Sequence, residues 1–374
     1  MTPNQSSVYL TPEIVAEFDL AGDLCAVSPY GSGHINDTFL ATLDRPNESQ
    51  QIVFQRINTH VFPDPIRLME NFCLITDHLR QKMKHDKQIG VDRRVLRHVN
   101  AVNRDPYVAM PNGDFWRATY YIPGTVTFDQ ATGPAQLYAA GFAFGRFQNQ
   151  LADLATPLAE TIVDFHHTVK RFAALKAAIE DDRCKRAGLI EAEIEFALKR
   201  ESLSAVLIDL QSAGRLPTRV IHNDTKISNV LFDEKTNEAL CMTDLDTVMP
   251  GLAAYDFGEL VRSGVSDSAE DEIDLQRVEV DFARFERIAA GFLAGVGPML
   301  TPLEVEHLVT GAKMMAFENG IRFLTDYLDG DRYFKIKRPQ QNLDRCRAQF
   351  ALLASLEVHE AELAACVKKL SVLS

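Results

Sequence analysis

One segment constrains the fold of this chain more than any other: residues 218–247, where short apolar runs alternate with polar loops. A strand-like run leads into a loop that carries Asp224, and Asn229 follows five residues later. Two further apolar runs, joined by a polar turn, return the chain to Asp244. Because a hairpin returns the chain to its starting end, we expect these three side chains to converge. The predicted strands are 218–221, 230–232 and 239–243.

A carboxylate, an amide oxygen and a second carboxylate in this arrangement suit phosphoryl transfer. Asp224 would orient and deprotonate an attacking hydroxyl, while Asn229 and Asp244 would hold Mg²⁺ against nucleotide phosphates. Asp-x-x-x-x-Asn alone is a weak signal, because both residue types also form turns. The ordered set of strands, with His222 two residues before Asp224 and Asp246 two residues after Asp244, indicates a kinase-type metal site. For Asp246 itself, direct metal contact and a structural role remain open.

The segment resembles the catalytic loop of protein kinases and, more closely, that of the aminoglycoside phosphotransferase and choline kinase group of small-molecule kinases. Within that group the chain looks like N-acetylhexosamine 1-kinases. The resemblance extends in order over nearly the whole chain. The blocks that carry it are 31–38, 55–62, 222–229, 244–251 and 322–328.

This resemblance implies an α+β fold of the bilobal protein-kinase-like type. A small β-rich N-terminal lobe would pack on a larger, mainly helical C-terminal lobe, with ATP and Mg²⁺ in the cleft. By the same resemblance Asp224 matches the catalytic base, and Asn229 and Asp244 match the metal ligands. Asp256 matches an acidic residue that braces the catalytic loop.

The hydrophobic pattern of the chain changes at Pro123-Gly124. Before this point the pattern predicts strands around one amphipathic helix at 65–84, and after it mostly helix. We therefore expect a nucleotide-binding lobe over 1–122 and a catalytic and substrate-binding lobe over 123–374. The longest helical patterns of the second lobe are 135–151 and 191–214.

A glycine turn, Gly31-Ser32-Gly33, separates the first two predicted strands. Its backbone N–H groups could lie against phosphate. It is not a Walker loop, because no Gly-Lys-Ser or Gly-Lys-Thr follows. A short glycine turn alone is usually only a hairpin, and the resemblance is what adds the nucleotide-binding interpretation for Gly31 and Gly33.

The third predicted strand would normally supply a lysine to the nucleotide phosphates. Here the run offers Gln55 or Arg56, and the sequence leaves open which of them faces the nucleotide. Arg56 keeps the positive charge, with Glu70 on the following helix as its expected partner. Tyr121 falls where the resembling family joins its lobes, so its backbone would bind adenine.

Candidates for the acceptor site are fewer. His34 lies beside the glycine turn, and Arg322 and Tyr333 lie on or just after a C-terminal helix. These groups suit a neutral, oxygen-rich ligand better than a cation, which Arg322 would repel. The pair His166-His167 lacks the i,i+4 spacing of a helical metal site, so we interpret it as part of a polar face.

Composition excludes several other classes. The chain has 39 Lys and Arg against 52 Asp and Glu, a net charge of −13, which makes nucleic acid an unfavourable partner. The uncharged stretch 288–303, which no other exceeds in length, is shorter than the roughly 20 residues of a membrane span. No Lys or Arg precedes Arg45, so no secretory signal is expected. Six scattered cysteines predict buried free thiols in a cytoplasmic protein.

The sequence therefore predicts an ATP-dependent kinase of a small-molecule hydroxyl. The resemblance favours the anomeric hydroxyl of N-acetylglucosamine or N-acetylgalactosamine. Three alternatives stay open: the same chemistry on an aminoglycoside, choline, methylthioribose or homoserine; a nucleotide-binding module without catalysis; and a protein kinase. The chain lacks the Ala-Pro-Glu segment of protein kinases, which argues against the third alternative. ATP against GTP, the preferred epimer and the oligomeric state are not determined.

Overall fold

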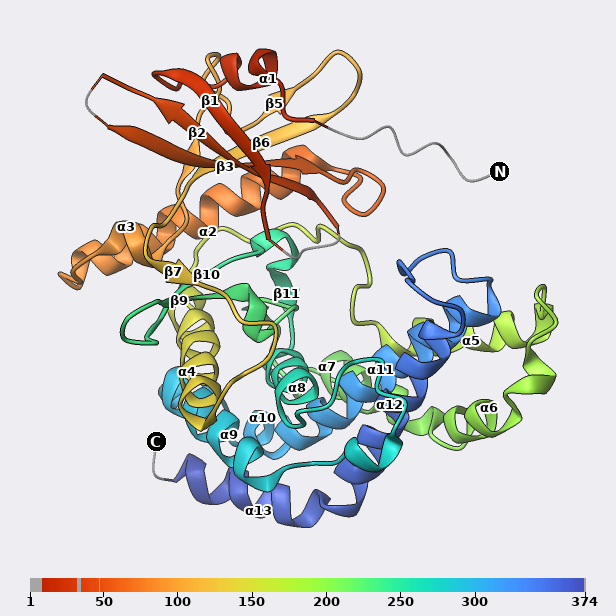
Figure 1. Ribbon diagram of the computed structural model, residues 1–374. Helices are drawn as coiled ribbons and strands as arrows, with labels where there is room; N and C mark the ends of the chain where they lie inside the picture. The colour runs from red at the N-terminus through yellow and green to blue at the C-terminus, as the bar shows by residue number, and fades with distance from the viewer. Residues whose placement is uncertain (1–8, 32–34, 47, 373–374) are drawn as a thin grey trace. The chain divides into compact units, whose positions relative to one another are not determined.

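The computed structural model describes residues 9–31, 35–46 and 48–372 and divides into two compact units, Met1–Gly124 and Thr125–Ser374 (Figure 1). The first unit is built on an antiparallel β-sheet, and the second is mainly helical with two small sheets. The predicted α+β class, with a β-rich N-terminal part and a helical C-terminal part, is therefore confirmed.

The sheet of the first unit has two different faces. Alternation along β3 places Ile52 and Phe54 in a core with Trp116, while Gln55 lies on the opposite face. That opposite face is covered by α2 (Pro65–His85), whose Phe72 ring lies 5.3 Å from the Arg117 guanidinium. The strands, in the sheet order β1-β2-β3-β6-β4 with β5 beside β6, are β1 (Asp23–Pro29), β2 (Asp37–Asp44), β3 (Ser49–Ile57), β6 (Phe115–Tyr120), β4 (His98–Val99) and β5 (Val108–Ala109). The short helices are α1 (Pro12–Ala16) and α3 (Val91–Arg94).

The second unit holds the strands predicted around the catalytic loop. One sheet has the order β10-β9-β7, and the other pairs β8 with β11, a strand that the sequence did not suggest. Their bounds are β7 (Thr125–Val126), β8 (Arg219–Ile221), β9 (Val230–Asp233), β10 (Ala239–Met242) and β11 (Met249–Gly251). The helices are α4 (Pro134–Leu151), α5 (Thr168–Asp181), α6 (Glu191–Leu198), α7 (Val206–Ser212), α8 (Ala253–Gly264), α9 (Phe282–Val296), α10 (Pro302–Glu306), α11 (Leu308–Leu328), α12 (Gln341–Val358) and α13 (Glu360–Ser371).

The single helix predicted over 191–214 is wrong. A 3₁₀ segment, Glu201–Ala205, separates α6 from α7. The Ser204 hydroxyl donates a hydrogen bond to the Glu201 carbonyl oxygen at 2.6 Å, which offers the backbone an alternative to the regular helical ladder.

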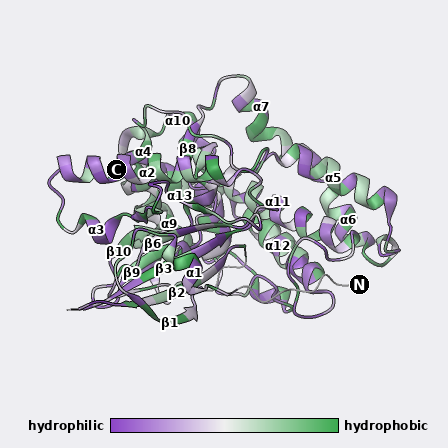
Figure 2. Cartoon of the chain, turned by 90° about the horizontal axis from the view of Figure 1, so that it is seen from above, coloured by the Kyte–Doolittle hydropathy of each residue, from purple (hydrophilic) through white to green (hydrophobic). Residues whose placement is uncertain are grey.

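Figure 2 shows hydrophilic and hydrophobic stretches alternating along α5 and α6, as in helices that expose one face.

Glycines bring α4 and α9 into backbone contact. Gly141 and Gly145 of α4 face Gly291 and Gly295 of α9. A Cβ atom built on any of the four would lie 2.2–2.6 Å from a carbonyl oxygen of the facing helix, closer than real Cβ atoms approach. Each helix thus carries a small-xxx-small pair that permits close packing. The same helix α4 carries Gln148, which donates a hydrogen bond to Asp256 of α8.

Two predictions from composition can be compared with the structure. All six cysteines are free, but Cys25 is exposed and Cys73 and Cys184 are half-buried, so the expectation of buried thiols is only partly right. Across the described ranges, no helix is long and apolar enough to cross a bilayer.

Candidate active site

The loop between β8 and β9 is held by hydrogen bonds to Asp256 of α8. The Asp256 carboxylate accepts hydrogen bonds from the backbone N–H groups of His222 (2.9 Å) and Asn223 (2.7 Å). The Gln148 amide donates a third, at 2.7 Å. Asp256 is fully buried, so these bonds are made without competition from water. Asp256 therefore braces the chain immediately before Asp224, the role that the resemblance implied for it.

The same loop is closed by side chains that bond to its backbone. Asn223 adopts a left-handed conformation (φ 65°), which Asn tolerates better than most residues, and its amide donates to the Thr247 carbonyl oxygen at 2.9 Å. The Thr247 hydroxyl returns a bond to the His222 carbonyl oxygen at 2.8 Å. The His222 ring is buried, with Nε2 2.9 Å from the Thr243 carbonyl oxygen. These bonds connect the loop to the chain that leads into Asp244.

The Asp224 carboxylate contacts two donors. Lys226 Nζ lies 2.9 Å from Oδ1, and the Asn229 amide nitrogen lies 3.0 Å from Oδ2. Burial alone would raise the pKa of Asp224, but the charge and hydrogen bond of Lys226, with the Asn229 bond, lower it below its ordinary value. Asp224 is therefore a carboxylate at neutral pH, able to accept a hydrogen bond from a hydroxyl.

The residues predicted as metal ligands offer hard oxygen atoms. Because the Asn229 nitrogen donates to Asp224, its Oδ1 remains as the atom for a cation. Asp244 follows β10 in a left-handed conformation (φ 55°) with an exposed side chain, and its neighbour Thr243 donates to the Asn229 carbonyl oxygen at 2.9 Å. No three His, Cys, Asp or Glu side chains of the described residues form a metal cluster. An amide and a carboxylate fit Mg²⁺, which takes few protein ligands and completes its shell with phosphate and water. Asp246 is buried.

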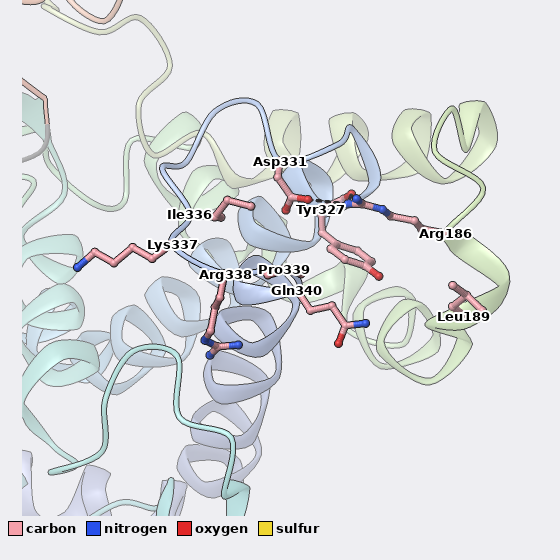
Figure 3. Close-up of a pocket in the computed structure, with 9 residues that line it drawn as sticks. All are labelled: Arg186, Leu189, Tyr327, Asp331, Ile336, Lys337, Arg338, Pro339 and Gln340. Atoms are coloured by element: carbon pink, nitrogen blue, oxygen red, sulfur yellow. Dashed lines mark hydrogen bonds and ion pairs between the residues drawn. The ribbon is translucent and has the colours of Figure 1, made fainter. Parts of the chain in front are cut away.

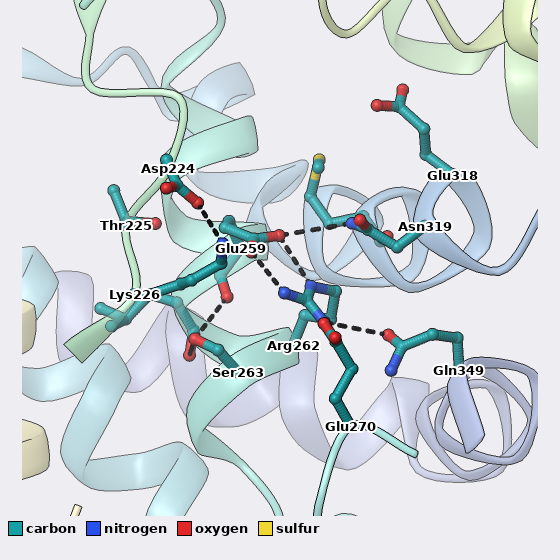
Figure 4. Close-up of polar contacts among 12 residues, drawn as sticks. Asp224, Thr225, Lys226, Glu259, Arg262, Ser263, Glu270, Glu318, Asn319 and Gln349 are labelled. Atoms are coloured by element: carbon teal, nitrogen blue, oxygen red, sulfur yellow. Dashed lines mark hydrogen bonds and ion pairs between the residues drawn. The ribbon is translucent and has the colours of Figure 1, made fainter. Parts of the chain in front are cut away.

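Lys226 is a residue that the sequence analysis missed. Its Nζ reaches Asp224, and the charges of Asp224 and then Glu259 raise the pKa of Lys226 (Figure 4). Behind it, Arg262 of α8 forms a buried ion pair with Glu259 at 2.6 Å. Lys226 therefore stays charged beside the Asp224 carboxylate. The signal in the sequence was a cation two residues after the proposed base.

His166 is not part of a polar face, so that interpretation is wrong. The ring is buried, with Nδ1 2.8 Å from Glu318 Oε1 and Nε2 3.2 Å from the Asn223 carbonyl oxygen. Burial would lower the pKa of His166, but the Glu318 carboxylate raises it. Because both partners accept, the ring is an imidazolium that donates from both nitrogens. The sequence hid this contact, since Glu318 lies 152 residues further along the chain.

Arg322 of α11 lies one helical turn after Glu318. Its guanidinium is placed between two aromatic rings, 5.9 Å from Phe165 and 5.5 Å from Phe334. Tyr333 is 63% exposed, and its ring packs edge-on to Phe334. The loop that carries both aromatic residues is held by the Asp326 carboxylate, which accepts from three backbone N–H groups, those of Arg332, Tyr333 and Phe334.

The nucleotide-binding residues predicted for the first unit are only partly described. Gly31 is exposed in a left-handed conformation (φ 78°), which favours glycine. Gly33 and His34 lie outside the described residues. The Tyr121 ring packs edge-on to Tyr30, with centroids 6.0 Å apart, and its backbone N–H donates to the Gln51 carbonyl oxygen.

The predicted pair of Arg56 with Glu70 is wrong. The Arg56 guanidinium contacts Asp37 at 2.7 Å and Asp114 at 3.1 Å, and Glu70 is exposed on α2. The reason is the alternation of β3, which places Arg56 and α2 on opposite faces of the sheet. On the α2 face Gln55 instead accepts a hydrogen bond from Arg117 at 2.9 Å.

The structure also contains a surface pocket of about 600 Å³ at the end of α11 (Figure 3). The Arg186 guanidinium on its wall pairs with Asp331 at 2.7 Å and lies 4.5 Å from the Tyr327 ring. None of the predicted site residues lines it. The lining residues are Arg186, Leu189, Tyr327, Asp331, Ile336, Lys337, Arg338, Pro339 and Gln340.

Comparison with known proteins places this geometry in context. The sequence pattern of the phosphotransferase enzyme family (APH) matches residues 26–290. A microcompartment-associated aminopropanol kinase has a similar structure, with a TM-score of 0.65 and 15% identity over 94% of this chain and 97% of that one. An aminoglycoside phosphotransferase from Alicyclobacillus acidocaldarius has a TM-score of 0.59 and 15% identity over 98% of each chain. A choline/ethanolamine kinase family protein from Mesorhizobium loti has a TM-score of 0.52 and 15% identity over 92% of this chain and 93% of that one.

Proposed function

The chain belongs to the phosphotransferase enzyme family, and we propose that it transfers the γ-phosphoryl group of ATP to the anomeric hydroxyl of an N-acetylhexosamine, yielding the sugar 1-phosphate. One observation carries the phosphotransferase assignment. The Asp224 carboxylate, kept ionised by Lys226 and Asn229, lies on a loop whose backbone is bonded on both sides. A base of this kind can align a hydroxyl and accept its proton.

The chain's own residues have separable tasks in this scheme. Asp224 orients the acceptor hydroxyl and takes its proton as the new P–O bond forms and the bond from the γ-phosphorus to the bridging oxygen breaks, which releases ADP. Asn229 Oδ1 and the Asp244 carboxylate would hold Mg²⁺, which when bound neutralises charge on the nucleotide phosphates. The Lys226 ammonium adds a second positive charge beside the group in transfer. Gly31 and Arg56 of the first unit remain the proposed contacts to the nucleotide.

The choice of a sugar rests on groups outside the catalytic loop. Arg322 and Tyr333 offer hydrogen-bond donors and an aromatic ring, which suit a ligand rich in oxygen. The similar structures named above include an aminopropanol kinase and a choline/ethanolamine kinase family protein, so an amino alcohol is the second candidate acceptor. A protonated amine would be repelled by Arg322, and this favours the neutral sugar.

A coupled assay of nucleotide turnover against a panel of acceptors tests the proposal. N-acetylglucosamine and N-acetylgalactosamine are expected to support turnover, and choline, ethanolamine and aminoglycosides are not. The product should release phosphate in mild acid, because a 1-phosphate is an acid-labile glycosyl ester. A product stable to mild acid, or turnover confined to the amines, would overturn the sugar assignment.

The variant Asp224→Asn serves as the control for the chemistry. Loss of the base should lower kcat by at least ~10²-fold, with little change in nucleotide affinity. Near-normal turnover by this variant would contradict the role of Asp224. If the wild-type protein binds nucleotide but turns over none of the acceptors, it is a nucleotide-binding module without catalysis.

A further inference from the structure

A second arginine lies beside Arg322. Arg171 extends from α5, which packs against α11 through the rings of Phe172 and Phe317, 6.0 Å apart. One Arg171 nitrogen, Nη2, donates to the Phe165 carbonyl oxygen at 3.1 Å. Its Nε is buried and has no acceptor among the described residues. Two helices distant in the sequence thus present two guanidinium groups to one region.

The donors of Arg322 are also available. Over the ranges that the structure describes, no carbonyl or carboxylate accepts a hydrogen bond from its guanidinium, which lies near two aromatic rings. Glu318, four residues before Arg322 on α11, is already engaged by His166 at 2.8 Å and by the Thr168 hydroxyl at 2.6 Å. Buried or half-buried guanidinium donors normally find acceptors, so their availability here indicates a ligand.

The charges around this pair do not cancel. His166 and Glu318 neutralise each other as imidazolium and carboxylate. Asp164 is paired with Lys170 at 2.6 Å. Both guanidinium groups lie at Phe165, and burial, then the like charge of Arg322, lowers the pKa of Arg171. The Asp326 carboxylate, four residues after Arg322, bonds to backbone N–H groups, so neither arginine has a carboxylate hydrogen-bonded to it among the described residues.

A chain of contacts connects the pair to the loop that carries the proposed base. His166 joins Glu318, one turn before Arg322, to the Asn223 carbonyl oxygen, and Asn223 directly precedes Asp224. A ligand bound by the arginines is thus connected to the catalytic loop through one buried side chain. The whole arrangement belongs to the second unit.

We propose that Arg171 and Arg322 together bind a planar oxygen group of the acceptor, an amide carbonyl or a carboxylate, and thereby exclude cationic acceptors. The guanidinium fork matches such groups better than any other side chain does, and two forks on one group satisfy donors that the protein leaves open. This inference rests on the proposed function and deepens it, because it assigns the specificity to Arg171.

The test compares hexoses that offer the arginines different groups, three of them altered only at C2 and glucuronate at C6. Binding is measured by calorimetry in the presence of a non-hydrolysable ATP analogue, and turnover by the coupled assay. N-acetylglucosamine presents an amide carbonyl, glucuronate a carboxylate, glucose neither, and glucosamine a cation. The wild type should bind one or both of the first two at least ~10-fold more tightly than glucose, and glucosamine least. The better of the two identifies the amide or the carboxylate as the natural group.

Variants assign the effect to Arg171. Arg171→Gln should weaken the preferred acceptor by ~10–100-fold and leave glucose and the KM for ATP nearly unchanged. Arg171→Lys keeps the charge but loses the fork, so it should recover only part of the affinity. Arg183→Gln removes an exposed arginine just after α5 and is the matched control, with no change expected.

The outcomes separate this inference from the proposed function. Turnover of sugars with an unaltered acceptor preference in Arg171→Gln would overturn the role of Arg171 and leave the kinase intact. Tight binding of glucosamine or ethanolamine would overturn the exclusion of cations. Absence of turnover with selective, Arg171-dependent binding of N-acetylglucosamine or glucuronate would refute the kinase proposal while supporting the binding site.

Discussion

The contact between α4 and α9 allows a prediction whose size follows from the geometry. In Gly145→Ala the new Cβ would lie 2.3 Å from the Phe292 carbonyl oxygen and 2.9 Å from the Val296 nitrogen. Both atoms are backbone, so no side chain can rotate away. The helices must separate locally by about 1 Å to restore an ordinary contact, and overpacking of this kind costs ~1–3 kcal/mol.

The displacement extends to the catalytic loop. Gln148 lies on the same helix, less than one turn from Gly145, and its 2.7 Å bond to Asp256 would lengthen beyond hydrogen-bonding distance. That adds ~1–3 kcal/mol for a buried group, while the higher helix propensity of Ala returns ~1 kcal/mol. We expect Gly145→Ala to lower the free energy of unfolding by about 1–5 kcal/mol and to reduce kcat.

Urea unfolding followed by far-UV circular dichroism measures this change. Gly188→Ala is the matched control, because a Cβ there meets nothing within 4 Å and its φ is ordinary. That variant should be as stable as the wild type or slightly more stable. Equal unfolding free energies for Gly145→Ala and the wild type would refute the argument from backbone contact.

The remaining predictions concern single groups. Asp244→Ala should weaken Mg²⁺-dependent nucleotide binding as well as turnover, and unchanged binding of MgATP by calorimetry would contradict a ligand role. Lys226→Met should lower kcat by at least ~10-fold with a near-normal KM for ATP, and an unaltered kcat in the coupled assay would exclude a role in transfer. Burial would raise the pKa of Glu304, but its hydrogen bond to Arg219 and its capping contacts with Thr301 lower it below its ordinary value. The stabilisation by Glu304 is therefore present above the pKa of this group in the unfolded chain, and it is lost as pH falls through the pKa in the folded protein. Thermal unfolding of Glu304→Gln should therefore depend less on pH below about 4.5 than that of the wild type, and parallel curves would contradict this.

The parts that were predictable from the sequence are those with short-range causes. The strands beside the catalytic loop follow from runs of apolar residues and turn signals, and the helix at 65–85 follows from its periodicity. The contact of Asp224 with Asn229 joins residues five apart on one loop, so the local pattern was sufficient to place them together. The predicted pairing of Arg56 with Glu70 failed because the sequence does not say which face of β3 packs against α2.

What the sequence determined by itself is the family of chemistry, since that depends on a few polar residues held by adjacent strands. Tertiary structure alone decided what surrounds them. His166 meets Glu318, Arg171 approaches Arg322, and Gln148 reaches Asp256 across separations of more than 100 residues. Such contacts depend on how closely helices pack, because they join side chains from elements that are distant in the sequence. For α4, which carries Gln148, the packing distance to α9 is set by four glycines whose partners lie on another helix.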